Sequence, residues 1–229
     1  MTSAGRYRDR TEAGRHLAGL LGKYAHRPDV LVLALPRGGV PVAFMVAEAL
    51  EAPLDVFLIR KLGVPGQEEL AMGAIASGDV LVLKNEVIRA LAIPQAVIER
   101  VATEERRELQ RREHAYRDDR PPVDIQGRTV IVVDDGLATG SSMRAAAVAL
   151  RRRRPARLVI AVPVAAPDTC EELRAEVDEI VCGRTPASFL AIGFWYDDFS
   201  QTTDEEVFDL LDRARNEERE HSASGPRAG

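Results

Sequence analysis

Residues 130–143 hold the densest set of side chains that could do chemistry. Four apolar residues predict a short buried strand, Asp134 and Asp135 follow it directly, and a small-residue turn leads into a helical pattern that begins near Ser141. The first N–H groups of a helix lack intrahelical partners and carry the positive end of its dipole, so they can bind phosphate. Two acids would repel that phosphate unless they serve sugar hydroxyls or a bridging divalent cation. The segment therefore predicts a phosphorylated sugar as ligand.

The same segment resembles the binding signature of the type I phosphoribosyltransferases, in which two acids after an apolar strand precede a loop with Thr-Gly and small residues. The resemblance implies binding of phosphoribosyl pyrophosphate (PRPP), with Asp134 and Asp135 at the ribose 2′ and 3′ hydroxyls. It places the 5′-phosphate in a loop of five residues: Ala138, Thr139, Gly140, Ser141 and Ser142. The alternative is an ordinary strand-to-helix turn with a solvated acidic pair. Other phosphate loops fit less well, because no G-x-G-x-x-G is present here and no Lys follows Gly140.

A second strand-loop-helix unit lies earlier in the chain. Residues 30–35 are an uninterrupted apolar run, and the sequence Pro-Arg-Gly-Gly-Val-Pro separates them from a helical pattern. Paired glycines let a backbone approach a ligand closely, and Arg37 adds a fixed positive charge. In the family this is the pyrophosphate loop, so the resemblance implies that Arg37, Gly38 and Gly39 bind the pyrophosphate of PRPP, often through a cis peptide. As a lone motif, the segment would equally fit an ordinary turn.

Residues 54–59 predict a third strand, which ends at Arg60 and Lys61. Cations at this end of a strand lie where open α/β sheets bind ligands, and they would suit a leaving pyrophosphate. A solvated strand end is the alternative for both. The Gly- and Pro-punctuated residues 62–69 match the flexible loop that closes over PRPP in resembling enzymes. Closure would protect a developing ribosyl cation from water.

Residues 186–199 hold five of the chain's eleven aromatic residues, enough to give an aromatic base a flat stacking surface. The segment resembles the C-terminal hood strand of purine phosphoribosyltransferases, which implies that Phe194 or Trp195 stacks on the acceptor and that Asp197 lies near its edge. A core-packing strand is the alternative. Ala138 occupies the position where 6-oxopurine enzymes carry an aspartate, the proposed base, and no obvious Lys precedes the hood. No general base is visible.

Composition bounds the remaining possibilities. The net charge of -5 gives no global basic field for nucleic acid. Cys170 and Cys182 lack CxxC spacing and the four histidines are scattered, so neither a zinc site nor a disulfide framework is expected. The apolar runs are too short to span a bilayer and the N-terminus lacks a signal-peptide core, so we expect a cytoplasmic protein without a membrane partner.

Alternating strands and helices predict an α/β fold with a Rossmann-like, mainly parallel sheet flanked by helices. The resemblance implies the type I phosphoribosyltransferase fold over residues 28–200, with a small hood and a helical insertion at 84–120. Its long charged helix fits a solvated face or a dimer arm. Residues 1–27 would form a basic segment, which in resembling proteins can join the hood, and a covering helix capped by Thr11. Residues 201–215 predict a final helix and residues 216–229 a disordered tail.

The resemblance implies a Mg²⁺-dependent phosphoribosyltransferase of nucleotide salvage, which displaces pyrophosphate from PRPP with a nitrogenous, purine-like acceptor. Asp134, Asp135, Arg37 and Lys61 would be the catalytic residues, and the two aspartates would reach the metal indirectly, through ribose or water. The expected partners are PRPP, a small heterocyclic acceptor and a second copy in a homodimer. A sensor of PRPP or nucleotides on the same fold, without catalysis, is the alternative function.

Overall fold

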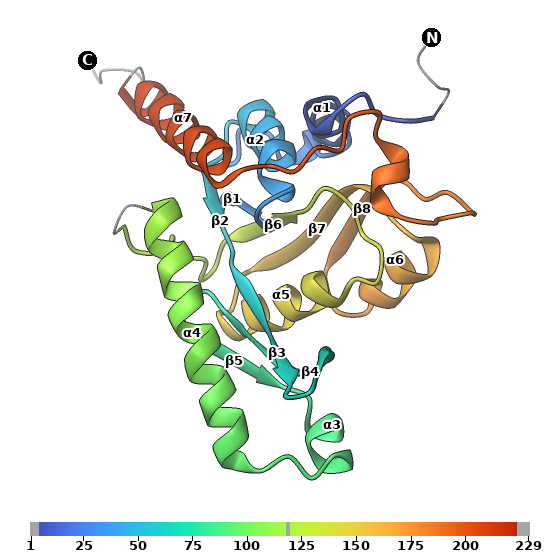
Figure 1. Ribbon diagram of the computed structural model, residues 1–229. Coiled ribbons are helices and arrows are strands. Elements are labelled where there is room, and N and C mark those ends of the chain that lie inside the picture. Colours follow the sequence, from blue (N-terminus) through green and yellow to red (C-terminus); the bar gives the residue numbers. More distant parts are fainter. Residues whose placement is uncertain (1–4, 118–119, 224–229) are drawn as a thin grey trace.

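A parallel sheet of five strands forms the centre of the molecule (Figure 1). The computed structural model describes residues 5–117 and 120–223. The strands are β1 (Val30–Ala34), β2 (Leu54–Val56), β6 (Thr129–Val133), β7 (Arg157–Val164) and β8 (Glu179–Arg184), in the order β2-β1-β6-β7-β8. Every residue of β1 and β6 is buried, which explains their uninterrupted apolar runs. The predicted mainly parallel α/β sheet is confirmed.

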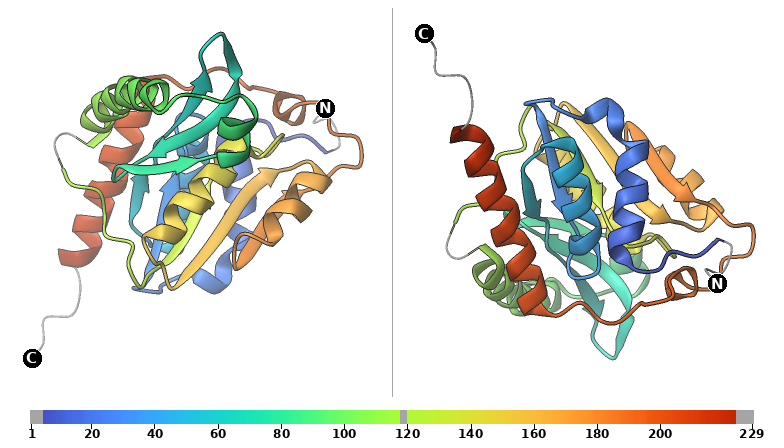
Figure 2. Two further views of the ribbon diagram at one scale, coloured as in Figure 1. Left: turned by 90° about the horizontal axis from the view of Figure 1, so that it is seen from below. Right: turned by 90° about the horizontal axis from the view of Figure 1, so that it is seen from above.

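Helices cover both faces of this sheet (Figures 1 and 2). On one face lie α1 (Arg10–Leu20), α2 (Gly39–Leu50) and α7 (Asp204–Ala223), and on the other lie α5 (Ser141–Arg152) and α6 (Pro167–Arg174). Because successive strand residues point to opposite faces, Val32 packs in the core below α1, α2 and α7, whereas Leu33 packs with α5 and α6. The sheet is therefore buried on both sides.

The strand order places two loops next to one another. Numbered by their sequence within this sheet, the strands run 2-1-3-4-5, so the connections reverse direction between β1 and β6. In open α/β sheets, ligands bind outside the carboxyl ends of the strands at such a switch point. The loops that follow β1 and β6 are those that contain Arg37 and the acid pair.

A smaller antiparallel sheet is inserted after β2. It consists of β3 (Ile59–Val64), β4 (Gln67–Ala76) and β5 (Val80–Leu83), and α3 (Asn85–Ala90) and α4 (Gln95–Arg117) follow it. Figure 1 shows this unit and the long α4 beside the large sheet. The helical insertion is present as predicted. The prediction of a single strand over residues 54–59 and of a flexible loop over residues 62–69 was wrong, because β2 ends at Val56 and the two strands of a β-hairpin occupy the loop.

The N-terminal helix, the hood and the C-terminal helix each differ from the prediction. Asp9, not Thr11, caps α1, and its carboxylate accepts a hydrogen bond of 2.8 Å from the backbone N–H of Glu12. The hood forms a short 3-10 helix, Ile192–Trp195, where a strand was expected. α7 continues to Ala223, so residues 216–223 are helical rather than disordered. The remainder of the predicted tail, 224–229, lies outside the described residues. Within residues 5–117 and 120–223, no helix is both long and apolar enough to cross a membrane.

Candidate functional site

The loop after β1 rests directly on the acid pair after β6. The backbone N–H of Leu35 donates to the carbonyl of Val133 at 2.9 Å, which joins the ends of the two strands. A Cβ atom on Gly39 would lie 3.0 Å from Cα of Asp134, and one on Gly38 would overlap the carboxylate of Asp135. The peptide bond between Pro36 and Arg37 is cis, as the family resemblance implies. Two glycines are therefore required for the loop to reach the acids.

The two carboxylates lie in an environment that disfavours their charges. Asp135 is 8% exposed, and Asp134 is partly buried, with its Oδ1 accepting the backbone N–H of Asp135 at 2.9 Å. Burial raises the pKa of Asp134 well above its usual range, and the neighbouring charge of Asp135 adds to the effect. Burial also raises the pKa of Asp135, against the opposing charge of Arg10. A ligand that donates hydrogen bonds or brings positive charge would stabilise both ions.

Arg10, the first residue of α1, binds Asp135 and was not predicted as a site residue. Its Nε and Nη2 atoms both lie 2.9 Å from Oδ2 of Asp135, and the two side chains are 12% and 11% exposed. Its Nη1 donates to the carbonyl of Ser200 at 2.7 Å, and its guanidinium lies 4.1 Å from the ring centre of Phe199. The only signal in the sequence was the basic character of residues 5–10, which says nothing about a partner 125 residues away.

The N-terminal segment pairs with the hood, as the resemblance allows. The backbone N–H of Tyr7 donates to the carbonyl of Trp195 at 2.8 Å, and that of Asp197 donates to the carbonyl of Tyr7 at the same distance. The hydroxyl of Tyr196, which is buried, donates to the backbone carbonyl of Asp135 at 2.6 Å. Burial raises the pKa of Tyr196, so this hydroxyl keeps its proton. Hood, N-terminal segment and acid pair thus form one structure.

The predicted acceptor residues have different surroundings. Phe194 is 61% exposed, whereas Trp195 packs against the cluster of Tyr7 and Tyr196. Asp197 lies 3.3 Å from Nε of Arg6. The hood contacts the acid-pair loop through another residue, since a Cβ on Gly136 would lie 2.5 Å from Cγ2 of Ile192.

The predicted phosphate loop follows the acid pair and opens onto α5. Gly140 adopts a left-handed conformation, with φ of 67°, and precedes the helix without a side-chain cap. Thr139, Ser141 and Ser142 are not buried, and Ala138 is half-buried. The first N–H groups of α5 therefore remain available to an anion.

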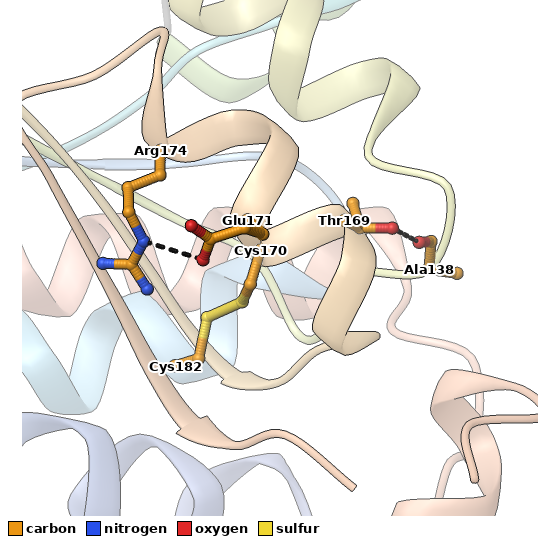
Figure 3. The surroundings of a disulfide bond; sticks show 6 residues. All are labelled: Ala138, Thr169, Cys170, Glu171, Arg174 and Cys182. Carbon is orange, nitrogen blue, oxygen red and sulfur yellow. Dashed lines mark hydrogen bonds and ion pairs between the residues drawn. A yellow bond between two sulfur atoms is a disulfide. The ribbon is translucent and has the colours of Figure 1, made fainter. Parts of the chain in front are cut away.

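A disulfide lies next to the contact between α6 and this loop (Figure 3). Cys170 of α6 is bonded to Cys182 of β8, so the expectation that the two cysteines form no disulfide was wrong. Their spacing matches no motif, and only the packing of α6 against β8 brings them together. The adjacent Thr169 donates its hydroxyl to the carbonyl of Ala138 at 2.6 Å, and Figure 3 shows that Thr169 and Cys170 both lie on α6.

The three predicted cations, Arg37, Arg60 and Lys61, each have different surroundings. Arg37 directs Nη1 toward Asp204 of α7, at 3.9 Å from Oδ1. Arg60 lies inside β3 and pairs with Glu105 of α4 at 2.6 Å, so the prediction that it ends a strand was wrong. Lys61 is exposed and shares its strand face with Ile59, which packs toward the α5 side of the core. Among the described residues, no group of three or more His, Cys, Asp or Glu side chains could hold a metal.

A parallel sheet with a glycine loop, an acid pair and a helix N-terminus at its switch point defines an α/β protein whose candidate site lies at the carboxyl edge of the sheet. A profile of the phosphoribosyl transferase domain matches residues 5–192, and the chain belongs to this family. Its fold is the type I phosphoribosyltransferase fold.

Similar proteins agree with this assignment. The structure of TT1426 from Thermus thermophilus is 44% identical, superimposes with a TM-score of 0.79, and the match covers 90% of this chain and 97% of that one. Two Mycobacterium tuberculosis sequences, one of them named "Putative phosphoribosyl transferase Rv0571c", are each 45% identical over 209 residues. The match covers 91% of this chain and 47% of each relative, so the chain spans about half the length of these relatives.

Proposed function

We propose that the protein transfers the 5-phosphoribosyl group from PRPP to a nitrogenous acceptor and releases pyrophosphate. The observation that carries the proposal is the contact of the Gly38-Gly39 loop with the acid pair, beside the uncapped start of α5. In this arrangement the acid pair would provide hydrogen-bond acceptors for a sugar. The glycine loop and the start of α5, which lie beside the acid pair, would each bind a phosphate group. Membership of the phosphoribosyl transferase domain family supports the same reaction class.

In the proposed complex, Asp134 and Asp135 accept hydrogen bonds from the ribose hydroxyls, and residues 138–142 bind the 5′-phosphate through backbone N–H groups. The backbone around Gly38 and Gly39 binds the pyrophosphate, assisted by Arg37 and Lys61. The acceptor nitrogen forms a bond to C1 with its lone pair, pyrophosphate leaves with the electrons of the broken C1–O bond, and the nitrogen's proton passes to solvent. Positioning and stabilisation of the leaving charge supply the catalysis.

Mg²⁺ is part of this proposal. One arginine faces the buried Asp135 and the partly buried Asp134, so the site carries an excess of negative charge that a cation would balance. Since the described residues form no metal cage, the ion would arrive with the pyrophosphate and reach the acids through ribose or water. When bound, it would neutralise charge on the leaving group.

The proposed acceptor is a purine-like heterocycle bound under the hood. Phe194 is the exposed aromatic of the hood helix and could stack on a base, and Asp197 lies two residues beyond Trp195. Ala138 offers no carboxylate to deprotonate an acceptor nitrogen, so an acceptor that already has a lone pair at the reacting nitrogen fits best. We also propose that the transfer takes place in the cytoplasm.

The proposal is tested by incubating the protein with PRPP, Mg²⁺ and a panel of purines, pyrimidines and other nitrogen heterocycles, while pyrophosphate release is followed. We expect release with at least one acceptor, and none when either PRPP or the acceptor is omitted. Tight binding of PRPP without turnover on any acceptor would instead identify a non-catalytic sensor.

The assigned roles are tested with the variant Asp134→Asn/Asp135→Asn. Amides keep the volume of the carboxylates but lose two charged acceptors, and a hydrogen bond to a charged group contributes about 1.5–3 kcal/mol. We expect PRPP binding to weaken by at least about tenfold while the circular dichroism spectrum is unchanged. Unchanged affinity would show that the acids do not hold the ribose.

A further inference from the structure

A pocket rich in arginine lies at the edge of the sheet opposite to the acid pair. It has a volume of about 260 Å³, and two acids, Asp55 and Glu218, line it together with five arginines: Arg117, Arg120, Arg128, Arg215 and Arg219. Arg128 immediately precedes β6, whereas Asp134 immediately follows it. At about 3.3 Å per strand residue, the two positions are roughly 20 Å apart, so the pocket is separate from the candidate active site.

Two of the five arginines that line the pocket, Arg117 and Arg215, are held in ion pairs with acids. Arg117 is buried and paired with Asp55 and Glu113, each at 3.0 Å, so its charge is fully balanced by acids. Arg120 and Arg128 donate instead to backbone carbonyls, of Arg117 at 3.1 Å and of Val30 at 2.9 Å, which leaves their charges without a carboxylate at those atoms. The arginines of the pocket therefore outnumber its acids.

Arg215 supplies a second, independent observation. Its Nη2 lies 3.2 Å from Oδ1 of Asp212, but its Nε is buried and has no hydrogen-bond partner among the described residues. Burial lowers the pKa of Arg215, and the nearby charge of Arg120 lowers it further, while Asp212 and Asp55 oppose both effects. A buried donor without an acceptor is unfavourable by about 1–3 kcal/mol. Because this Nε has almost no solvent-accessible surface, an anion in the pocket would accept from it only after the Arg215 side chain turns toward the pocket.

The chemistry of these side chains favours phosphate over other anions. Guanidinium groups present planar, paired donors that match the oxygens of phosphate, and several of them converge here from α7, from the segment after α4 and from the residue before β6. The protein as a whole has a net charge of -5, so this concentration of arginine is local. The volume of about 260 Å³ suits a small ligand.

We propose that this arginine pocket binds a small phosphate-bearing anion, at a site distinct from the one that would hold PRPP. The proposal does not depend on the transfer reaction, since none of the five arginines belongs to the candidate active site. A nucleic acid backbone is a different class of ligand and would need a long basic groove, whereas these arginines surround one pocket of limited volume.

The test is calorimetric titration of the full chain with inorganic pyrophosphate. Two variants separate the sites: Arg120→Gln/Arg219→Gln removes two charges from the pocket, and Arg37→Gln alters the active-site loop. We expect the first variant to lose the pocket's binding, with affinity at that site reduced about tenfold or more, and the second variant to retain it. If the active site does not bind pyrophosphate, the wild type shows the pocket's site alone, and the two proposals are judged separately.

The matched control is Arg100→Gln/Arg107→Gln, which removes the same charge from the exposed part of α4. We expect it to bind like the wild type. The subtler variant Arg215→Lys keeps the charge but loses the buried Nε donor, and we expect a several-fold loss with an unchanged melting temperature. Equal binding by wild type and Arg120→Gln/Arg219→Gln, or no binding by the wild type apart from that lost in Arg37→Gln, would overturn the proposal. So would an effect of the pocket variants on a single-stranded oligonucleotide but not on pyrophosphate.

Discussion

The ion pair between Arg10 and Asp135 gives the most direct test of how the site is held together. The change is Arg10→Gln, which keeps a polar side chain but removes the charge that faces a buried carboxylate. Removing one partner of a buried pair destabilises a protein by about 3–5 kcal/mol. Because these side chains are 12% and 11% exposed, and because Asp135 can take up a proton, we expect a smaller loss of about 2–3 kcal/mol at about pH 8.

The loss has three sources, and a double-mutant cycle separates them. Arg10 also donates to the carbonyl of Ser200 and lies over the ring of Phe199, and Arg10→Gln weakens both contacts. The cycle with Asp135→Asn isolates the pair, for which we expect a coupling energy of about 2 kcal/mol. The measurement is urea unfolding of the wild type, both single variants and the double variant, each without ligand.

The pH dependence follows from the direction of the pKa shift. Arg10 opposes the rise in the pKa of Asp135, so in Arg10→Gln this pKa rises further above its value in the unfolded chain. A carboxyl with a raised pKa destabilises the fold when it is ionised and not when it is protonated. The deficit of Arg10→Gln should therefore be largest at alkaline pH and shrink as the pH falls through the raised pKa.

Two outcomes would refute this reasoning. One is a coupling energy below about 0.5 kcal/mol at about pH 8, the value of an exposed surface pair. The other is a deficit that grows on acidification. Arg8→Gln serves as the control, because Arg8 is an exposed arginine on the same segment that pairs with its neighbour Asp9, and we expect it to leave the unfolding curve unchanged.

Three further changes test other parts of the site. Asp134→Asn should stabilise the unliganded protein by about 1 kcal/mol, seen as a melting temperature higher by about 2–4 °C, because it removes a desolvated charge; a lower melting temperature would contradict the raised pKa. Gly38→Ala should destabilise by about 1–3 kcal/mol in urea, because its Cβ would overlap the carboxylate of Asp135, whereas Gly19→Ala, in open space on α1, should not destabilise. Cys182→Ser should lower the unfolding free energy by about 3 kcal/mol, since the disulfide closes a loop with a sequence separation of 12, and dithiothreitol should then have no further effect.

The central sheet could be predicted because its strands are buried on both faces. Residues 30–35 and 130–133 read as continuous apolar runs, and each is followed by a polar or glycine-rich loop at the carboxyl edge. The inserted hairpin could not be predicted in the same way. The first four residues of β4 are all exposed, so burial imposes no alternation on them, and backbone pairing across Pro65 and Gly66 defines the strand instead.

The hood was hard to predict because its contacts are non-local. Tyr7 and Tyr196 pair through their backbones although most of the chain separates them in sequence, and Arg10 reaches Ser200 across a separation of 190 residues. No periodicity reports such contacts, and the aromatic content of residues 186–199 fitted a strand as well as the 3-10 helix that forms. The cysteines illustrate the same limit, since their pairing depends on how α6 packs against β8.

The charges of the acid pair limit which ligands the site can bind, whichever nitrogenous acceptor takes part in the reaction. The two carboxylates carry more negative charge than the one arginine beside them balances, so a bare phosphate ion would be repelled near Asp134. It would be stabilised instead at the start of α5. A sugar that spans both regions satisfies each: its hydroxyls donate to the acids and its phosphate accepts from the helix. A second phosphate group on the same sugar would meet the glycine loop beside Arg37, whose Nη1 lies 3.9 Å from Oδ1 of Asp204 on α7. In the proposed reaction, we therefore expect the separation of acids, helix N-terminus and glycine loop to favour a sugar that carries phosphate groups at both ends.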